Sequence, residues 1–165
     1  MTHRPFVPWP HPALKTTAAP VDGIADKIHA IWDEMIAAME AMPGVGLAAP
    51  QLGIGLRLAV VDASHERGQA IRMANPEIIH RSMKLEKGYE ASPNLPGVGA
   101  DICRPRGISL RYTDHTGMIV RKDLVGLWAR SAQHQVDHLN GRMYFHNLSK
   151  LKRDMLLKKA HKLCG

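Results

Sequence analysis

Cysteine is scarce in this sequence, which contains only Cys103 and Cys164. Their spacing suggests neither a disulfide framework nor a C-x-x-C metal pair. Long apolar runs are also missing, because the longest uncharged apolar stretches fall far short of the roughly 20 residues that a membrane helix needs. The proline-broken N-terminal segment lacks the apolar core of roughly 7–15 residues found in a signal peptide. We therefore predict a cytoplasmic protein with no membrane span and no membrane partner.

Acidic residues are outnumbered by basic ones, since 22 Lys and Arg face 15 Asp and Glu and give a net charge of +7. Such a charge can attract nucleic acid or another polyanion, and it is equally an ordinary way of staying soluble. The chain has 165 residues, of which 45% are hydrophobic. This length and composition predict a single folded domain over residues 1–165 and exclude a disordered chain.

The first third of the chain divides into an arm and a helix. Five of the eleven prolines precede Asp22, which predicts an extended arm on the surface. Apolar residues then recur at helical spacing from Ile24 to Met39. Asp22 is the expected N-cap of this helix, and the Pro43-Gly44 pair is expected to end it.

The remainder predicts short strands followed by two helices. The expected strands are residues 56–62, 71–74, 78–85, 108–112 and 118–121, the last two joined as a hairpin. A central helix is expected over residues 124–139, ended by Asn140-Gly141. A last helix, capped by Ser149 and running to about Leu163, carries mostly basic residues.

His134 and His138 are four residues apart in the central helix, within the segment H-Q-V-D-H. This spacing places both imidazoles on one helix face, where they could share a metal ion. A hydrolytic zinc helix carries H-E-x-x-H, and its Glu accepts a proton from metal-bound water. Here Gln135 has the shape of that Glu but not its basicity. If no metal is bound, the two residues are simply buried or hydrogen-bonded histidines.

The segment from Gly44 to Gln51 reads G-V-G-L-A-A-P-Q and allows three interpretations. It matches a dinucleotide-binding turn, but Pro50 obstructs the helix that such a turn requires. It could be a tight surface turn. It could also be a binding loop, in which the glycines let the backbone approach a ligand and Gln51 offers an amide donor.

Together these segments resemble the peptide deformylase family. The family's motif G-Φ-G-Φ-A-A-P-Q is intact at residues 44–51, and Q-H-E-x-D-H is present at residues 133–138 with one change. The motif E-G-C-L-S falls on residues 90–94, where only Glu90 is retained. Supporting similarity covers residues 10–14, 74–78, 104–105, 112–117, 126–130 and 148–153. The resemblance implies an α+β fold with small antiparallel or mixed sheets around the central helix, plus N-terminal and C-terminal helices.

The resemblance also implies an activity: the metal-dependent, hydrolytic removal of the formyl group from the N-terminal Met of nascent proteins. In the family a Cys and two His hold the divalent metal, and these positions map to Ser92, His134 and His138. A serine hydroxyl stays protonated near neutral pH and is a poor ligand for Fe, Zn or Ni. We therefore expect a metal site of reduced affinity, or none.

Two further departures bear on catalysis. The family's general base maps to Gln135, which cannot accept a proton. The family stabilises the oxyanion with a Gln side chain, here Gln51, and with the backbone N–H of the residue after the Cys. That residue is Pro93, which has no N–H. A family Arg that contacts the substrate backbone maps to Gly99. The resemblance assigns substrate contacts to Gly44, Val45, Gly46, Leu47 and Glu90.

For the other residues named here, we predict an ion pair, core packing and a candidate alternative metal ligand. Asp137 is expected to pair with Arg104 or to orient a His, with a solvated carboxylate as the alternative. Leu127, Trp128 and the Met-rich first helix are expected in the core rather than in a pocket. Cys103 could offer a substitute thiolate, although strand alternation leaves its face open.

The sequence leaves three functional hypotheses. In the leading one the protein keeps the deformylase fold but has lost most or all of the activity, and acts as a pseudoenzyme in translation or N-terminal protein processing by binding (formyl-)Met peptides or the ribosome. The second is an altered metallohydrolase that uses His134 and His138. The third is a ribosome- or RNA-binding protein acting through the basic C-terminal helix, the part that docks on the ribosome in bacterial relatives.

Overall fold

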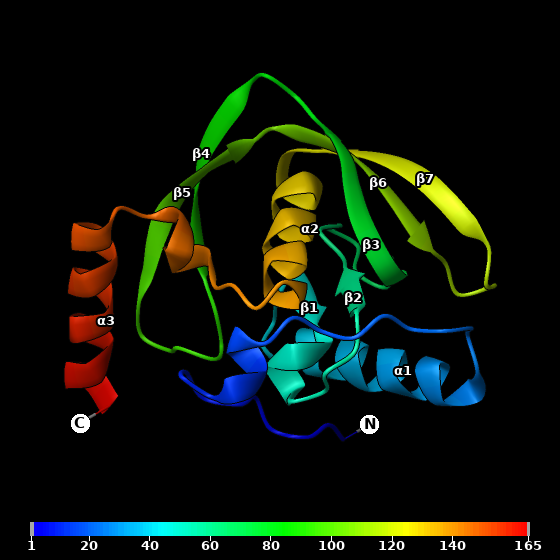
Figure 1. Ribbon diagram of the computed structural model, residues 1–165, viewed down its shortest axis with the longest axis horizontal. Coiled ribbons are helices and arrows are strands. Elements are labelled where there is room, and N and C mark those ends of the chain that lie inside the picture. The colour runs from blue at the N-terminus through cyan, green and yellow to red at the C-terminus, as the bar shows by residue number, and fades with distance from the viewer. Residues whose placement is uncertain (1, 165) are drawn as a thin grey trace.

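Residues 2–164 are described by a computed structural model, and Figure 1 shows their arrangement. Strands follow one another through the middle of the chain and the long helices lie before and after them, a segregation typical of an α+β fold. The elements are η1 (Pro12–Lys15), α1 (Asp26–Ala41), β1 (Gly46–Ala48), η2 (Ala49–Leu52), β2 (Leu58–Val61), β3 (Ile71–Arg81), β4 (Leu85–Ala91), β5 (Gly99–Pro105), β6 (Gly107–Thr113), β7 (Ile119–Val125), α2 (Gly126–Leu139), η3 (Tyr144–Asn147) and α3 (Lys150–Cys164). The predicted fold class is confirmed.

The strands form two antiparallel sheets. One has five strands in the order β1-β2-β3-β6-β7, and the other pairs β4 with β5. Helix α2 stands at the centre with the strands around it, and α1 lies across the end of β1 and β2 (Figure 1). This arrangement leaves one face of α2 directed between β1 and β4, where the candidate site lies.

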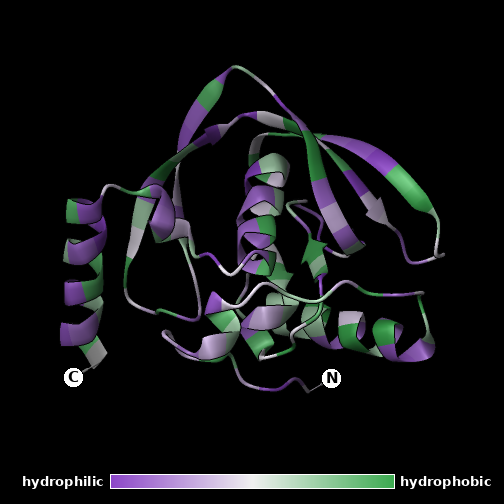
Figure 2. Ribbon diagram, in the orientation of Figure 1, coloured by the Kyte–Doolittle hydropathy of each residue, from purple (hydrophilic) through white to green (hydrophobic). Residues whose placement is uncertain are grey.

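Three apolar clusters hold the layers together. The first joins α2 to the five-stranded sheet through residues such as Ala132 and Leu110. The second joins α1 to β1 and β2, with Trp32 fully buried at its centre. The third joins η3, β5 and α3, and α3 docks there by Leu156 and Ala160. Hydrophilic residues predominate along α3 (Figure 2), although Leu151, Met155 and Leu163 on this helix are more than 60% exposed.

Several expected boundaries are wrong. Helix α1 begins at Asp26, and its N-cap position is Ala25 rather than Asp22, because Gly23 adopts a left-handed φ of 78° that the helix cannot include. The two strands expected over residues 71–85 are one continuous strand, β3, up to Arg81. Register irregularities after Ala74 accommodate the Asn-Pro pair that suggested a break.

The ends of the central helix and the last helix follow the sequence more closely. Leu124 belongs to β7, and α2 begins at Gly126. Ser149 caps α3 as expected, because its hydroxyl accepts a hydrogen bond from the Lys152 N–H at 3.3 Å. The hairpin of β6 and β7 also matches the prediction.

The structure bears on two further predictions, which concern membrane-spanning helices and the position of Cys103. None of the helices within residues 2–164 is long and apolar enough to cross a membrane. Cys103 on β5 is an exposed free thiol and does not line the candidate site. The side chain of Cys164 lies outside the described part of the structure.

Candidate active site

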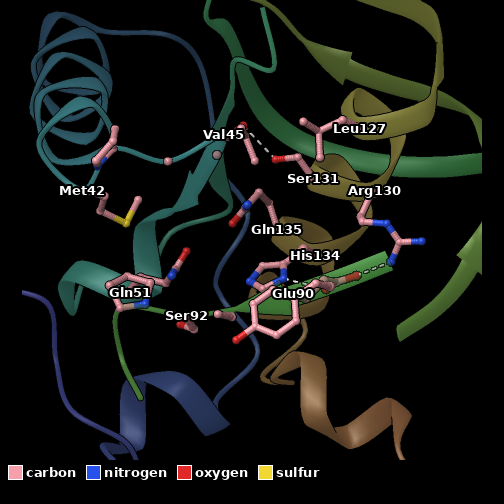
Figure 3. A pocket seen from close by; sticks show the side chains of 16 residues that line it. Met42, Val45, Gln51, Glu90, Ser92, Leu127, Arg130, Ser131, His134 and Gln135 are labelled. Atoms are coloured by element: carbon pink, nitrogen blue, oxygen red, sulfur yellow. Dashed lines mark hydrogen bonds and ion pairs between the residues drawn. The ribbon is translucent and has the colours of Figure 1, made fainter. Parts of the chain in front are cut away.

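A pocket of about 390 Å³ opens between the loop that leads into β1, the end of β4 and one face of α2 (Figure 3). Nine of the residues that the sequence singled out line it: Gly44, Val45, Gly46, Gln51, Glu90, Ser92, Pro93, His134 and Gln135. Of the three interpretations of residues 44–51, the structure therefore favours a binding loop, since this segment forms one wall of a pocket.

Leu47 and Leu127 lie differently from expectation, whereas the burial of His138 was one of the expected alternatives. Leu47 is fully buried in the cluster under α1 and does not line the pocket, because alternation along β1 turns it away from Gly46. His138 is also fully buried and lies one helical turn beyond His134. The expectation that Leu127 belongs to the core is wrong, since its side chain is 51% exposed and lines the pocket. Trp128 does pack against the core.

The two histidines contact each other directly, with 3.2 Å between their Nε2 atoms. His134 Nδ1 lies 2.8 Å from Glu90 Oε1. Because Glu90 is ionised, it accepts a hydrogen bond from Nδ1–H, which leaves His134 Nε2 as an acceptor for the Nε2–H of His138. His138 Nδ1 then has no hydrogen-bond partner in the described residues. Complete burial, followed by the effects of His134 and Arg104, lowers the pKa of His138 well below its usual value, so this imidazole is neutral.

Glu90 is the centre of a buried charge cluster that the sequence indicated only in part. Its carboxylate accepts hydrogen bonds from Arg104 at 2.6 and 2.9 Å and from Arg130 at 2.7 Å. Burial opposes the ionisation of Glu90, but the hydrogen bonds from Arg104 and His134 outweigh it and lower its pKa to about 2. Arg104 also donates to Asp137 at 3.0 Å, which confirms the expected pair. The cluster orients His134 from below the pocket.

Gln135 occupies the position next to His134 on the pocket wall (Figure 3). It is 4% exposed, and its Oε1 has no partner among residues 2–164. Gly46 lies against it closely enough that an added Cβ would meet Gln135 Nε2 at 2.5 Å and would also clash with Ser131 Oγ. The second glycine of the loop is therefore required by this close approach of β1 to α2.

Ser92 and Gln51 form a hydrogen-bonded group with Asn94 on the opposite wall. The Ser92 hydroxyl donates to Asn94 Oδ1 at 3.1 Å, and Gln51 Nε2 donates to the same oxygen at 2.8 Å. All three side chains are at least 95% buried. Pro93 also lines the pocket and supplies no N–H.

The side chains present do not fit a resident divalent metal. Two neutral imidazoles are available, but Ser92 has a protonated hydroxyl directed to Asn94 where a thiolate would be needed. Within the described range 2–164, no group of three or more His, Cys, Asp or Glu side chains is placed to hold a metal ion. The donor set therefore differs from the one that the family resemblance implies.

Several residues of this site had no predicted role, among them Arg130, Ser131 and Asn94. Arg130 lies beside the pocket and donates to Glu90 and to the main-chain oxygens of Ile102 and Glu86. Nothing in the local sequence distinguishes it from the other arginines. Asn94 differs from the family's residue in the E-G-C-L-S motif, and the sequence shows that difference. Its hydrogen bonds to Val7 and Gln51 are tertiary contacts that the sequence does not show.

Taken together, these features define the class of the protein: an α+β fold with a pocket built over a histidine-bearing helix. The family model described as polypeptide deformylase matches residues 3–154. The chain belongs to the polypeptide deformylase family.

Individual relatives agree with this assignment. A peptide deformylase from Phenylobacterium zucineum is 37% identical over 164 residues, with 98% of this chain and 97% of the relative covered. One from Rhizobium meliloti is 35% identical, with 98% and 94% covered. The crystal structure of the Ehrlichia chaffeensis peptide deformylase in complex with actinonin has a TM-score of 0.91 at 32% identity, with 98% of each chain covered.

Proposed function

We propose that this cytoplasmic member of the deformylase family binds N-formylmethionyl peptide ends and that its deformylation is lost or strongly impaired. The observation that carries the proposal is the presence in one pocket of Ser92, Pro93 and Gln135, where the family has Cys, Leu and Glu. Each of these positions carries a different part of the hydrolysis. A single change would leave the other parts in place, whereas these three affect metal binding, proton transfer and oxyanion stabilisation together.

The loss of the general base is the simplest of the three effects. The Gln135 amide cannot accept a proton, and the absence of general acid–base catalysis typically costs about 10²–10⁴ in rate. Its uncharged amide can still hydrogen-bond a neutral group in the pocket, since its Oε1 has no partner in the described chain. A buried acceptor of this kind suits the N–H of a bound amide.

The oxyanion site is also reduced. Pro93 has no backbone N–H, and a single lost oxyanion donor costs about 10²–10³ in kcat in other enzymes. The two losses cannot be multiplied, because groups that act as a unit are not additive. The rate is therefore expected to fall by at least about 10² relative to a chain with the family residues.

The binding part of the pocket is better retained. Its volume of about 390 Å³ is within the usual range for a small ligand. Apolar side chains of Met42, Val45 and Leu127 line it (Figure 3) and suit a methionine side chain. Glu90 and Arg130 pair with each other, so the charges at the pocket are compensated. A neutral formylated end is therefore favoured over a free, cationic N-terminus.

The first experiment measures formate release from a formyl-Met peptide, with protein loaded anaerobically with iron and separately with nickel or zinc, and with bound metal quantified. Calorimetry with formyl-Met and unformylated Met peptides measures binding in the same preparations. We expect binding of the formylated peptide and formate release at least about 10² slower than in the triple variant S92C/P93L/Q135E. The control S82C/Q69E introduces the same Ser-to-Cys and Gln-to-Glu changes away from the pocket.

The outcomes separate the hypotheses. Rapid formate release by the natural protein would refute the proposal. Stoichiometric metal with turnover of another amide or ester would support the altered metallohydrolase that uses His134 and His138. If the triple variant gains no activity, the pocket itself has diverged from its relatives, and the three substitutions do not explain the impairment.

A second proposal concerns α3, which docks by Leu156 and Ala160 and leaves its basic residues outside this contact. These are Lys150, Lys152, Arg153, Lys158, Lys159 and Lys162. The single acidic residue of the helix, Asp154, is paired with Lys150 at 2.6 Å. We propose that this surface binds the ribosome or RNA, because an exposed cationic helix attracts a polyphosphate backbone.

This second proposal predicts salt-sensitive binding to purified ribosomes and to single-stranded RNA. The variant K158Q/K159Q is expected to lower the slope of log K against log salt by about 1.4, since each phosphate contact contributes about 0.7 for single strands. The control R121Q/K122Q removes the same charge from β7. Equal effects of the two variants would indicate a general charge effect and would refute a site on α3.

A further inference from the structure

Asn94 connects three segments of the chain beside the pocket, and it is 2% exposed. Its Nδ2 donates to the main-chain oxygen of Val7 at 2.7 Å and to that of Gln51 at 3.0 Å. Its own main-chain oxygen accepts from the Trp9 N–H at 2.8 Å. The N-terminal arm, η2 and the loop after β4 therefore meet at this one side chain.

These contacts determine which way the Asn94 amide faces. Two carbonyl oxygens surround one end, and a carbonyl can only accept, so that end must be the NH₂ group. The opposite end is therefore Oδ1, which receives Gln51 Nε2 at 2.8 Å and the Ser92 hydroxyl at 3.1 Å. The Gln51 amide is oriented independently, because its Oε1 accepts from the Ala48 N–H at 2.9 Å.

The consequence concerns two groups that line the pocket. Gln51 and Ser92 each direct a hydrogen toward Asn94 rather than into the pocket. The E-G-C-L-S motif of the family has Ser at position 94. A serine there carries one short hydroxyl, which cannot donate to two carbonyl oxygens while accepting from two donors. The four hydrogen bonds made by the Asn94 side chain therefore depend on the amide.

We propose that Asn94 is a positioning residue that withholds one N–H of the Gln51 amide from a ligand in the pocket, and so keeps kcat below its full value even where the other family residues are restored. The inference rests on the proposed function, since it assumes that Gln51 would otherwise donate to the formyl oxygen of the substrate. Asn94 acts through Gln51 and does not itself contact the ligand.

The kinetic test adds N94S to the triple variant S92C/P93L/Q135E and measures formate release from a formyl-Met peptide. A fully lost oxyanion donor costs about 10²–10³, and Gln51 keeps one of its two N–H groups. We therefore expect kcat to rise about 10-fold, with KM unchanged. The matched change N140S, at an exposed Asn beyond α2, is expected to leave kcat unchanged. Equal kcat with and without N94S in an active triple variant would overturn the inference.

A second measurement needs neither a variant nor an active enzyme. In the natural protein, nuclear magnetic resonance follows hydrogen exchange of the Gln51 side-chain amide, with the exposed Gln69 as the internal reference. We expect one Gln51 hydrogen to exchange at least 10-fold more slowly than those of Gln69, a bound derived from burial of its bond to Asn94. Exchange as fast as that of Gln69 would refute the withheld amide. If every revertant is inactive, the explanation of the impairment fails, and the Gln51 exchange alone decides the role of Asn94.

Discussion

Replacing Glu90 by Gln tests whether the charge cluster below the pocket holds the fold together. The carboxylate accepts hydrogen bonds from two arginines and lies 2.8 Å from His134 Nδ1. Gln has nearly the same shape, so the substitution removes the charge and one acceptor without leaving a cavity. Arg104 would then keep a buried positive charge with only Asp137 as its acidic partner.

The expected loss of stability is large. Removing one partner of a buried ion pair typically costs about 3–5 kcal/mol, because the other charge is left uncompensated. The lowered pKa of Glu90, which reflects the same contacts, leads to a similar magnitude. Its fall from 4.5 to about 2 corresponds to about 3 kcal/mol at 1.36 kcal/mol per pKa unit. We therefore expect E90Q to lose about 3 kcal/mol of unfolding free energy at pH 7.

The same pKa predicts how this loss changes with pH. The folded-state pKa of Glu90 is lowered, so its contribution is complete above the unfolded value of 4.5 and is lost as the pH falls toward 2. At pH 3 about half of it should remain. His138 also destabilises the fold on acidification, because its pKa is lowered too. The Glu90 charge opposes this lowering, so E90Q lowers the pKa of His138 further and the difference between the two proteins includes a contribution from His138.

Urea unfolding of the natural protein and of E90Q, at pH 7, 5 and 3, measures this difference. The control is E77Q, because Glu77 pairs with Arg111 at 2.9 Å on the surface, where both side chains are more than half exposed. Such a pair is worth at most about 1 kcal/mol. A loss in E90Q no larger than in E77Q, or a difference that does not shrink between pH 5 and pH 3, would refute the reasoning.

Three further substitutions test the pocket and the core. Gly46→Ala is expected to cost about 1–3 kcal/mol in urea unfolding and to weaken formyl-Met peptide binding, because the new Cβ displaces Gln135 and Ser131. Leu127→Ala should weaken calorimetric peptide affinity about 5-fold with little change in stability, since this half-exposed side chain loses about 1 kcal/mol of apolar contact. Trp32→Phe should cost about 2 kcal/mol in urea unfolding, because it removes buried volume and the indole hydrogen bond to a β3 oxygen at 3.2 Å.

The two pocket substitutions each have a control in the same chain. Gly55→Ala introduces a Cβ with nothing within 4 Å and should leave stability and binding unchanged. Met118→Ala removes a 65% exposed apolar side chain at the β6–β7 turn, far from the pocket residues, and should not alter peptide affinity. If Gly55→Ala equals Gly46→Ala, or Met118→Ala equals Leu127→Ala, the effects do not come from the pocket. A Trp32→Phe protein as stable as the parent would contradict the packing argument for α1.

Much of the site was predictable because its residues lie within short segments. The H-Q-V-D-H spacing alone places His134 and His138 on one helix face, and a binding loop was one of three interpretations of residues 44–51. The predicted substrate contact of Leu47 was wrong, because a sequence motif does not show on which face of a strand a side chain lies. Residues on strands alternate, and only the position of the neighbouring sheet decides which face is buried.

The sequence by itself determined the family, the identity of the altered residues and the helical periodicities, because these depend on residue type and on contacts within a few positions. Tertiary structure alone decided the charge cluster of Glu90 with Arg104 and Arg130, and the amide contacts of Asn94 with Val7 and Gln51. These partners are separated by 14 to 87 positions along the chain. Their hydrogen bonds exist only once strands and helices cross, and burial then makes each of them costly to lose.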